Sequence, residues 1–155
     1  MITLRPFTRE DLPALDGWCK TIDAWRYLSR CVPRRFNRRS LPADEAYQWS
    51  VIVVDGTAVG TVWLEKEEAG IVRLGILIGR EDLLGQGIGR AAIDLAIRTA
   101  PADFSLARVR LHVRKNNARA IACYRACGFR QTGEGCKLDP QGESIEFLEM
   151  EKARA

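Results

Sequence analysis

The sequence predicts an α/β protein with a mixed, mostly antiparallel central sheet of about seven strands flanked by four helices. Two observations support this fold class. Residues 51–78 contain three consecutive strand patterns joined by turn residues, which is typical of an antiparallel meander. The pattern then changes to a helix, a strand and a second helix before two final strands. Helices that connect strands in this way must pack on the faces of the sheet.

The chain begins with a strand followed by a helix. Ile2–Arg5 alternates apolar and polar residues, as a half-buried strand does. Thr8 is a suitable N-cap, and Asp11 places an acid in the first turn of the helix that follows. The apolar residues of this helix recur at helical spacing: Leu12, Leu15 and Trp18.

The next segment is rich in arginine. We expect a short helix over residues 23–29, a loop over 31–42, and either a helical turn or the start of a strand over 44–49. Between residues 26 and 43 there is no acid, and the segment carries Arg26, Arg30, Arg34, Arg35, Arg38 and Arg39. Such a segment is either a solvated loop or a surface for an anionic partner.

The centre of the chain predicts a three-stranded meander. Val51–Val54 and Thr57–Glu65 are joined by Asp55-Gly56, a strong hairpin signal. Residues 66–70 are expected to turn the chain into a third strand, Ile71–Ile78.

The second half alternates helices and strands. One helical face is formed by Ile88, Ala91, Ala92, Leu95, Ala96 and Thr99. A strand is expected over 109–114 and a helix over 117–127, with Gly128 as its C′ residue. The last two strands are predicted over 129–136 and 144–151.

Bulk properties favour one domain, residues 1–155, in the cytoplasm. The chain is 46% hydrophobic and 28% charged, with no apolar run long enough for a membrane span and no signal-peptide core. Its five cysteines and single histidine lack metal-ligand spacing, so we expect free thiols and no metal. The net charge of +4 is modest, and the lack of an aromatic stacking motif argues against nucleic acid as a partner.

The stretch that organises the chain runs from residue 73 to 100. It joins an apolar strand to a helix through the loop Gly85-Gln86-Gly87-Ile88-Gly89. A glycine loop that opens into a helix offers backbone N–H groups and a positive helix end to a phosphate. The loop lacks the lysine of a P-loop and the context of a dinucleotide fingerprint. The alternative is that these glycines only form a tight turn.

A second motif, Asn117-Ala118-Arg119-Ala120-Ile121-Ala122-Cys123-Tyr124-Arg125-Ala126-Cys127-Gly128-Phe129, gives the loop a more specific meaning. Together the two motifs resemble the GNAT superfamily of acetyl-CoA-dependent N-acetyltransferases, strongly over residues 71–130. The sequence looks most like the ribosomal-protein, aminoglycoside and polyamine acetyltransferases of that superfamily. The resemblance implies the GNAT fold, with the sheet splayed between strands 71–78 and 109–114.

The resemblance also implies where acetyl-CoA binds. The loop and first helical turn would hold the pyrophosphate, the backbone around Leu77 and Ile78 would face the pantetheine arm and the thioester, and residues 8–49 would set acceptor specificity. The implied cofactor-binding residues are Leu77, Ile78, Gly85, Gln86, Gly87, Ile88, Gly89, Arg90, Asn117, Ala120 and Tyr124.

The implied reaction is direct transfer of the acetyl group to a primary amine in a ternary complex. Tyr124 would protonate the leaving CoA thiolate. Glu65 is the first candidate for the general base, followed by Glu146 and Asp23, and a water relay is an alternative. We expect His112 to be structural, because it alternates with apolar residues on its strand.

Two departures from the family pattern leave other functions open. Arg73 stands where relatives often have a glutamate at the acceptor amine, and Leu84 replaces an Arg or Gln of the loop pattern. A non-catalytic acyl-CoA-binding regulator is therefore one alternative. The arginine-rich segment from Arg26 to Arg39 favours a second alternative, a ribosome- or RNA-associated protein. The acceptor could be a small molecule, a protein N-terminus or a lysine, with a preference for anionic acceptors over polycations, and a homodimer is possible.

Overall fold

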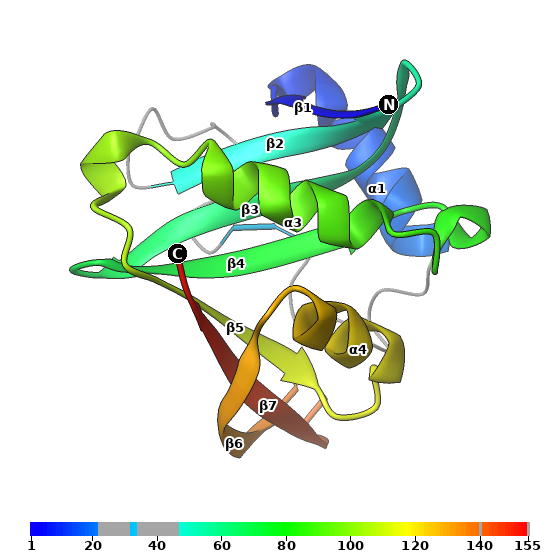
Figure 1. Cartoon of the computed structure of the whole chain (residues 1–155). Coiled ribbons are helices and arrows are strands. Elements are labelled where there is room, and N and C mark those ends of the chain that lie inside the picture. Colours follow the sequence, from blue (N-terminus) through cyan, green and yellow to red (C-terminus); the bar gives the residue numbers. More distant parts are fainter. Residues whose placement is uncertain (22–31, 34–46, 140, 155) are drawn as a thin grey trace.

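The computed structural model describes residues 1–21, 32–33, 47–139 and 141–154 (Figure 1). The predicted helix at 23–29 and nearly all of the arginine-rich segment lie outside these residues. Within them the chain forms seven strands and three α-helices. The strands are β1 (Ile2–Pro6), β2 (Tyr47–Val54), β3 (Thr57–Glu68), β4 (Ile71–Ile78), β5 (Arg108–Arg114), β6 (Arg130–Leu138) and β7 (Ser144–Ala153). The helices are α1 (Leu12–Thr21), α3 (Ile88–Arg98) and α4 (Ala118–Ala126), with 3-10 turns at Arg9–Asp11, Glu81–Leu83 and Ala102–Phe104.

The seven strands form one mixed sheet in the order β1-β2-β3-β4-β5-β7-β6. Strands β2 to β4 form the predicted antiparallel meander, β1 pairs antiparallel with β2, and β4 and β5 are the one parallel pair among the described strands. The long connection from β4 through α3 to β5 makes this parallel pairing possible. The sheet confirms the predicted fold class.

Two apolar clusters lie on opposite faces of the sheet. On one face, α3 packs through residues such as Ala92, Ile93 and Ala96. On the other face, Leu15 and Trp18 of α1 pack against aromatic residues of the sheet. Figure 1 shows α3 in front of the sheet and α1 behind it.

The predicted turn at 66–70 is wrong in its first part. Residues 66–68 extend β3, and a bulge lies between Lys66 and Glu68. The charged run resembles a turn in sequence, but the bulged Glu67 carboxylate meets the Arg73 and Arg110 guanidinium groups on the sheet face. Because its charge is paired there, the strand continues to Glu68 and only Ala69 and Gly70 turn the chain.

Other boundaries differ by a few residues. The ambiguous stretch before residue 50 is strand from Tyr47 onward, β6 ends at Leu138 rather than at residue 136, and β7 continues to Ala153. Each extension adds pairs to a neighbouring strand, which local sequence does not reveal. None of the helices in the described ranges is long and apolar enough to cross a membrane.

Glycines allow bulky indoles to lie flat on the sheet. A methyl group on Gly75 would overlap the ring of Trp63, its register partner on β3. We therefore predict that Gly75→Ala lowers the free energy of unfolding by about 1–3 kcal/mol, because the ring has to move out of its packed position. Urea unfolding followed by circular dichroism measures this change.

Gly17→Ala in α1 is the matched control. A methyl group there would have no described atom within 4 Å. Alanine also restricts the unfolded chain more than glycine does, so this variant should gain about 0.5–1 kcal/mol. Equal effects of the two substitutions would contradict the packing explanation.

Candidate active site

The central feature of the site is the point where β4 and β5 diverge. The two strands pair in parallel only over Ile71–Arg73 and Arg108–Arg110. Beyond these residues β5 turns away and pairs with β7 alone in the described chain (Figure 1). The backbone edge of β4 after Arg73 therefore has no β5 partner, which is the predicted splay of the sheet.

The direction of the β4 backbone groups follows from one hydrogen bond. The Gly79 N–H donates to the Val59 carbonyl at 2.8 Å, toward β3. Because N–H and C=O groups alternate sides along a strand, those of Ile76 and Ile78 point to the opposite edge, toward the divergence. Leu77 directs its backbone toward β3 and its side chain into the α1-side cluster.

The glycine loop leads from β4 into α3. Gly85 and Gly87 have φ of 80° and 81°, the left-handed region that favours glycine, and Gly87 is the N-cap of α3. The Gln86 side-chain amide donates to the Asp82 carbonyl at 2.9 Å, which closes the loop on itself. Exposed Arg90 lies in the first turn of α3, next to the positive end of the helix dipole.

Gly89 brings α3, β4 and α4 together. A Cβ at this position would lie 3.4 Å from the Cys123 Sγ and 3.5 Å from the Ile78 Cδ1. A larger side chain would push α4 or the end of β4 away. The glycine loop, the end of β4 and α4 therefore lie next to one another.

Helix α4 places Asn117 and Tyr124 on this side of the sheet. The Asn117 Oδ1 caps the helix by accepting from the Ala120 N–H at 3.3 Å. Tyr124 is buried two turns later, with its ring edge-on to Phe129 at a centroid distance of 5.9 Å. Burial raises the pKa of the phenol well above its usual range, so the hydroxyl keeps its proton at neutral pH.

Cys123 on α4 and Cys127 at the C-cap of α4 carry thiols that interact with each other. A hydrogen bond from Cys127 lowers the pKa of the Cys123 thiol, and the Arg90 charge contributes in the same direction. The hydrogen bond with Cys123, together with burial, raises the pKa of the Cys127 thiol. The four described cysteines are free thiols, as expected.

The α1 face of the sheet, opposite to the face that carries Tyr124, holds the predicted base Glu65. Glu65 alternates with the α3-side Leu64, so it lies on the α1 face, buried in β3 and in register with Arg73 of β4. Tyr124 belongs to the α3-side cluster. The structure therefore places the two predicted catalytic residues on opposite faces of the sheet. Of the other predicted bases, Glu146 is exposed near the start of β7 and Asp23 lies outside the described residues.

The departure at Arg73 is explained by an ion pair. Its guanidinium donates to both carboxylate oxygens of Glu67 at 2.7 and 3.0 Å. Arg110 reaches the same carboxylate at 3.2 Å from β5. Arg73 therefore belongs to a charge cluster that joins β3, β4 and β5 where β4 and β5 diverge. These bonds hold the pKa of the Glu67 carboxyl below its usual range. The hydrogen bond from Arg73 is the largest cause, and burial of the carboxyl acts in the opposite direction.

His112 lies on the same charged face, one step beyond this cluster. Its Nε2 is 3.2 Å from the Glu149 Oε2, and its ring lies 4.6 Å from the Phe147 ring centroid. Burial lowers the pKa of the imidazole although Glu149 opposes the change. Sequence reasoning missed Glu149 and Glu67, because cross-strand register and the β3 bulge bring them to their partners. The alternation of His112 with buried residues was the only local signal.

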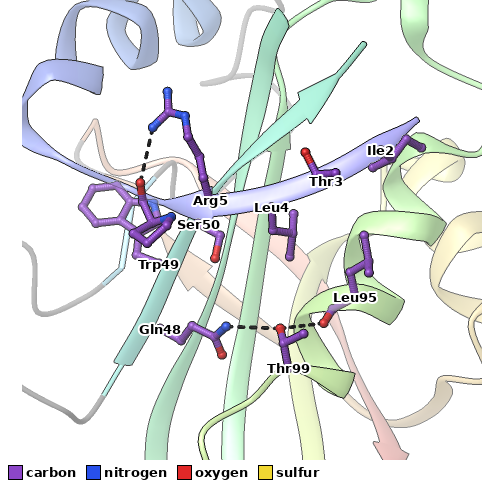
Figure 2. Close-up of a pocket in the computed structure, with 10 residues that line it drawn as sticks. Ile2, Thr3, Leu4, Arg5, Gln48, Trp49, Ser50, Leu95 and Thr99 are labelled. Carbon is purple, nitrogen blue, oxygen red and sulfur yellow. Dashed lines mark hydrogen bonds between the residues drawn. The ribbon is translucent and has the colours of Figure 1, made fainter. Parts of the chain in front are cut away.

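A separate groove of about 550 Å³ lies elsewhere, between the β1–β2 edge and the end of α3 (Figure 2). There the Gln48 side-chain amide donates to the Thr99 Oγ1, which donates to the Leu95 carbonyl (Figure 2). None of the predicted site residues lines this groove. Among the described residues, no three His, Cys, Asp or Glu side chains are grouped as metal ligands.

Known proteins are similar to this chain in sequence and in fold. Residues 1–130 match the family model described as acetyltransferase (GNAT) domain. Peptidyl-lysine N-acetyltransferase YjaB from Salmonella typhimurium (strain LT2) is 26% identical over 155 residues, which cover 97% of each chain.

Solved structures show the same fold at lower identity. Aminoglycoside acetyltransferase AAC(6')-Ib in complex with coenzyme A superposes with a TM-score of 0.76 at 21% identity, over 99% of this chain and 95% of that one. Spermidine N-acetyltransferase from Vibrio cholerae, in complex with CoA and spermine, gives a TM-score of 0.79 at 21% identity with the same coverage. The match over most of the chain, together with the two motifs and the divergent strands, shows that this protein is an N-acetyltransferase of the GNAT family.

Proposed function

We propose that the protein transfers the acetyl group of acetyl-CoA to a primary amine by direct attack in a ternary complex. The observation that carries this proposal is the divergence of β4 and β5 beside the glycine loop of α3. Free backbone groups on β4 suit the amides of a pantetheine arm, and the loop suits a pyrophosphate. Structural neighbours in complex with coenzyme A support the assignment.

Cofactor contacts follow from the chain order. The N–H groups of Gly85 to Arg90 would converge on the pyrophosphate, with the Arg90 guanidinium as an additional cation. The pantetheine arm would pair along β4 near Leu77 and Ile78, and the Ile78 N–H would stabilise the oxyanion of the thioester carbonyl. At the start of α4, Asn117 and Ala120 would contact the arm from the other side of the divergence.

Tyr124 supplies the proton for the leaving group. Its buried phenol is neutral at physiological pH, and α4 places it on the side of the sheet that carries the loop. When the C–S bond breaks, the CoA thiolate takes the phenol proton. The acceptor nitrogen then loses its second proton, and this proton restores the neutral phenol of Tyr124.

We expect the acceptor to approach from the α1 face. The structural neighbours include an aminoglycoside acetyltransferase in complex with kanamycin and a spermidine acetyltransferase in complex with spermine. The arginine content of residues 26–39 instead favours an acceptor whose amine is flanked by carboxylates or phosphates. A lysine side chain or N-terminus in an acidic peptide has this chemistry.

An amine panel tests the proposed function. Release of free CoA is measured with spermine, kanamycin, a basic lysine peptide and an acidic lysine peptide of the same length. We expect turnover, with the highest kcat/KM for the acidic peptide and a clear loss of this preference at high salt. Turnover with the polycations alone would contradict the acceptor class. Calorimetric binding of acetyl-CoA without turnover on any amine would support the non-catalytic alternative instead.

Arg90→Gln tests the pyrophosphate site. Loss of one charge-assisted hydrogen bond, worth about 1.5 kcal/mol, should raise the Kd for acetyl-CoA about tenfold. Arg98→Gln at the other end of α3 removes the same charge from an exposed position and should leave the Kd unchanged. Calorimetry at two salt concentrations measures both variants. Equal effects of the two substitutions would show that Arg90 acts only through general charge.

Tyr124→Phe tests the proton donor. The phenylalanine ring keeps the packing against Phe129, so the melting temperature and the Kd for acetyl-CoA should stay close to those of the wild type. Because the thiolate then has to leave without a proton from the enzyme, kcat should fall by about 10²-fold. An unchanged kcat at saturating substrates would remove Tyr124 from this role.

A further inference from the structure

We propose that His112 is the general base of this acetyltransferase, and that Glu149 holds its imidazole in the productive tautomer. This inference rests on the proposed function and names the group that removes the proton from the acceptor ammonium.

The position of His112 is the first argument. Arg110 is the last residue of β5 that pairs with β4, and His112 follows two residues later, where β5 borders the divergence. Val109, Leu111 and Val113 belong to the α3-side cluster, so His112 lies on the opposite face. The imidazole and the Tyr124 phenol therefore lie on opposite faces beside the divergence. An amine and a leaving thiolate on opposite sides of the thioester need this arrangement.

The tautomer is the second argument. Glu149 is the direct register partner of His112 on β7, and its Oε2 is 3.2 Å from the Nε2. The hydrogen bond with His112 lowers the pKa of the Glu149 carboxyl, so the carboxylate is ionised and can only accept. The Nε2 must then carry the proton, which leaves a lone pair on the Nδ1. The other carboxylate oxygen accepts from the Thr132 hydroxyl at 3.3 Å, which fixes its orientation.

The surrounding charges keep the imidazole neutral. Burial is the main cause of its lowered pKa, and the Arg73 charge from β4 and the Lys137 charge from β6 act in the same direction. Glu149 from β7 opposes them. Because the pKa lies below the ordinary value of 6.5, the imidazole is the free base at neutral pH and can accept a proton.

Glu65 is the competing candidate, and its position is less favourable. It lies in β3 at the level of Arg73, so β4 separates it from the divergence. His112 lies on a strand that borders the divergence directly. The geometry therefore favours His112 over the carboxylate that the sequence suggested.

The proton transfers balance. The His112 Nδ1 takes one proton from the ammonium, and the free amine attacks the thioester carbon. The C–N bond forms, the C–S bond breaks, and the thiolate takes the Tyr124 proton. The nitrogen loses its second proton to restore the phenol, and the imidazolium releases its proton to water, so one proton is liberated per acetyl group transferred.

The single histidine of the chain makes a direct test possible. The imidazole C–H signals can be titrated by NMR without assignment, and the pH dependence of kcat/KM is measured on the same protein. We expect kcat/KM to fall below pH 6.5 with a midpoint that equals the NMR pKa. His112→Gln should lower kcat/KM by about 10²-fold. It should also remove the fall of kcat/KM at low pH, the acid limb of the profile.

Two variants that keep the histidine change its pKa in opposite directions. Glu149→Gln removes the charge that raises the pKa, so the acid limb and the NMR midpoint should both move to lower pH. Lys137→Gln removes a charge that lowers it, so both should move to higher pH. Circular dichroism and the Kd for acetyl-CoA verify that each variant is folded.

The outcomes separate the two proposals. The wild type could turn over while the acid-side fall of kcat/KM in these variants does not follow the NMR midpoint. That result would overturn the role of His112 and leave the proposed function intact. The same conclusion follows if Glu65→Gln, and not His112→Gln, removes the limb. Absence of turnover by the wild type on every amine overturns the proposed function together with the base.

Discussion

The structure depends on the constraint that β4 and β5 pair for only three residues. A sheet normally satisfies its backbone groups by pairing, and a strand edge left without a partner inside a protein requires another one. Beyond Arg73 the Ile76 and Ile78 edge of β4 has no strand partner from β5 in the described chain. An extended chain of amides in a cofactor would satisfy the same groups. The proposed binding site would therefore be a consequence of interrupted sheet pairing.

Two kinds of contact maintain the interruption. On the α3 face, Gly89 lets α3 and α4 approach the end of β4 closely, so both helices lie beside the divergence. On the α1 face, the Glu67 carboxylate bridges Arg73 and Arg110 at the last paired position. The bridge joins β3, β4 and β5 where pairing stops, and the bulge in β3 brings Glu67 to that position. The three side chains are only partly exposed, so solvent ions screen the bridge less than they screen a fully exposed pair.

Much of this arrangement could be predicted from the sequence, because its signals are local. Strand alternation, the Asp55-Gly56 turn and the apolar face of α3 predict the order of elements. The caps at Gly87 and Asn117 are likewise visible as residue types at helix ends. The charge pairs were not predictable: Glu149 meets His112 through register, and Glu67 meets Arg110 from 43 positions away through a bulge. The sequence likewise gives no sign of the Glu149 partner on which the proposed role of His112 depends, because tertiary structure defines that partner.

In the proposed mechanism, the two faces of the sheet separate the two proton transfers that acetylation of an ammonium requires. On the α3 face, burial raises the pKa of Tyr124, so the phenol stays protonated. On the opposite face, burial and the charges of Arg73 and Lys137 lower the pKa of His112, so the imidazole stays neutral. Desolvation disfavours the charged form of each group, which produces a neutral acid and a neutral base at the same pH. Arg73, which departs from the family pattern, contributes to this state through its charge. The substitution that argued against catalysis in the sequence thus favours a neutral base in the structure.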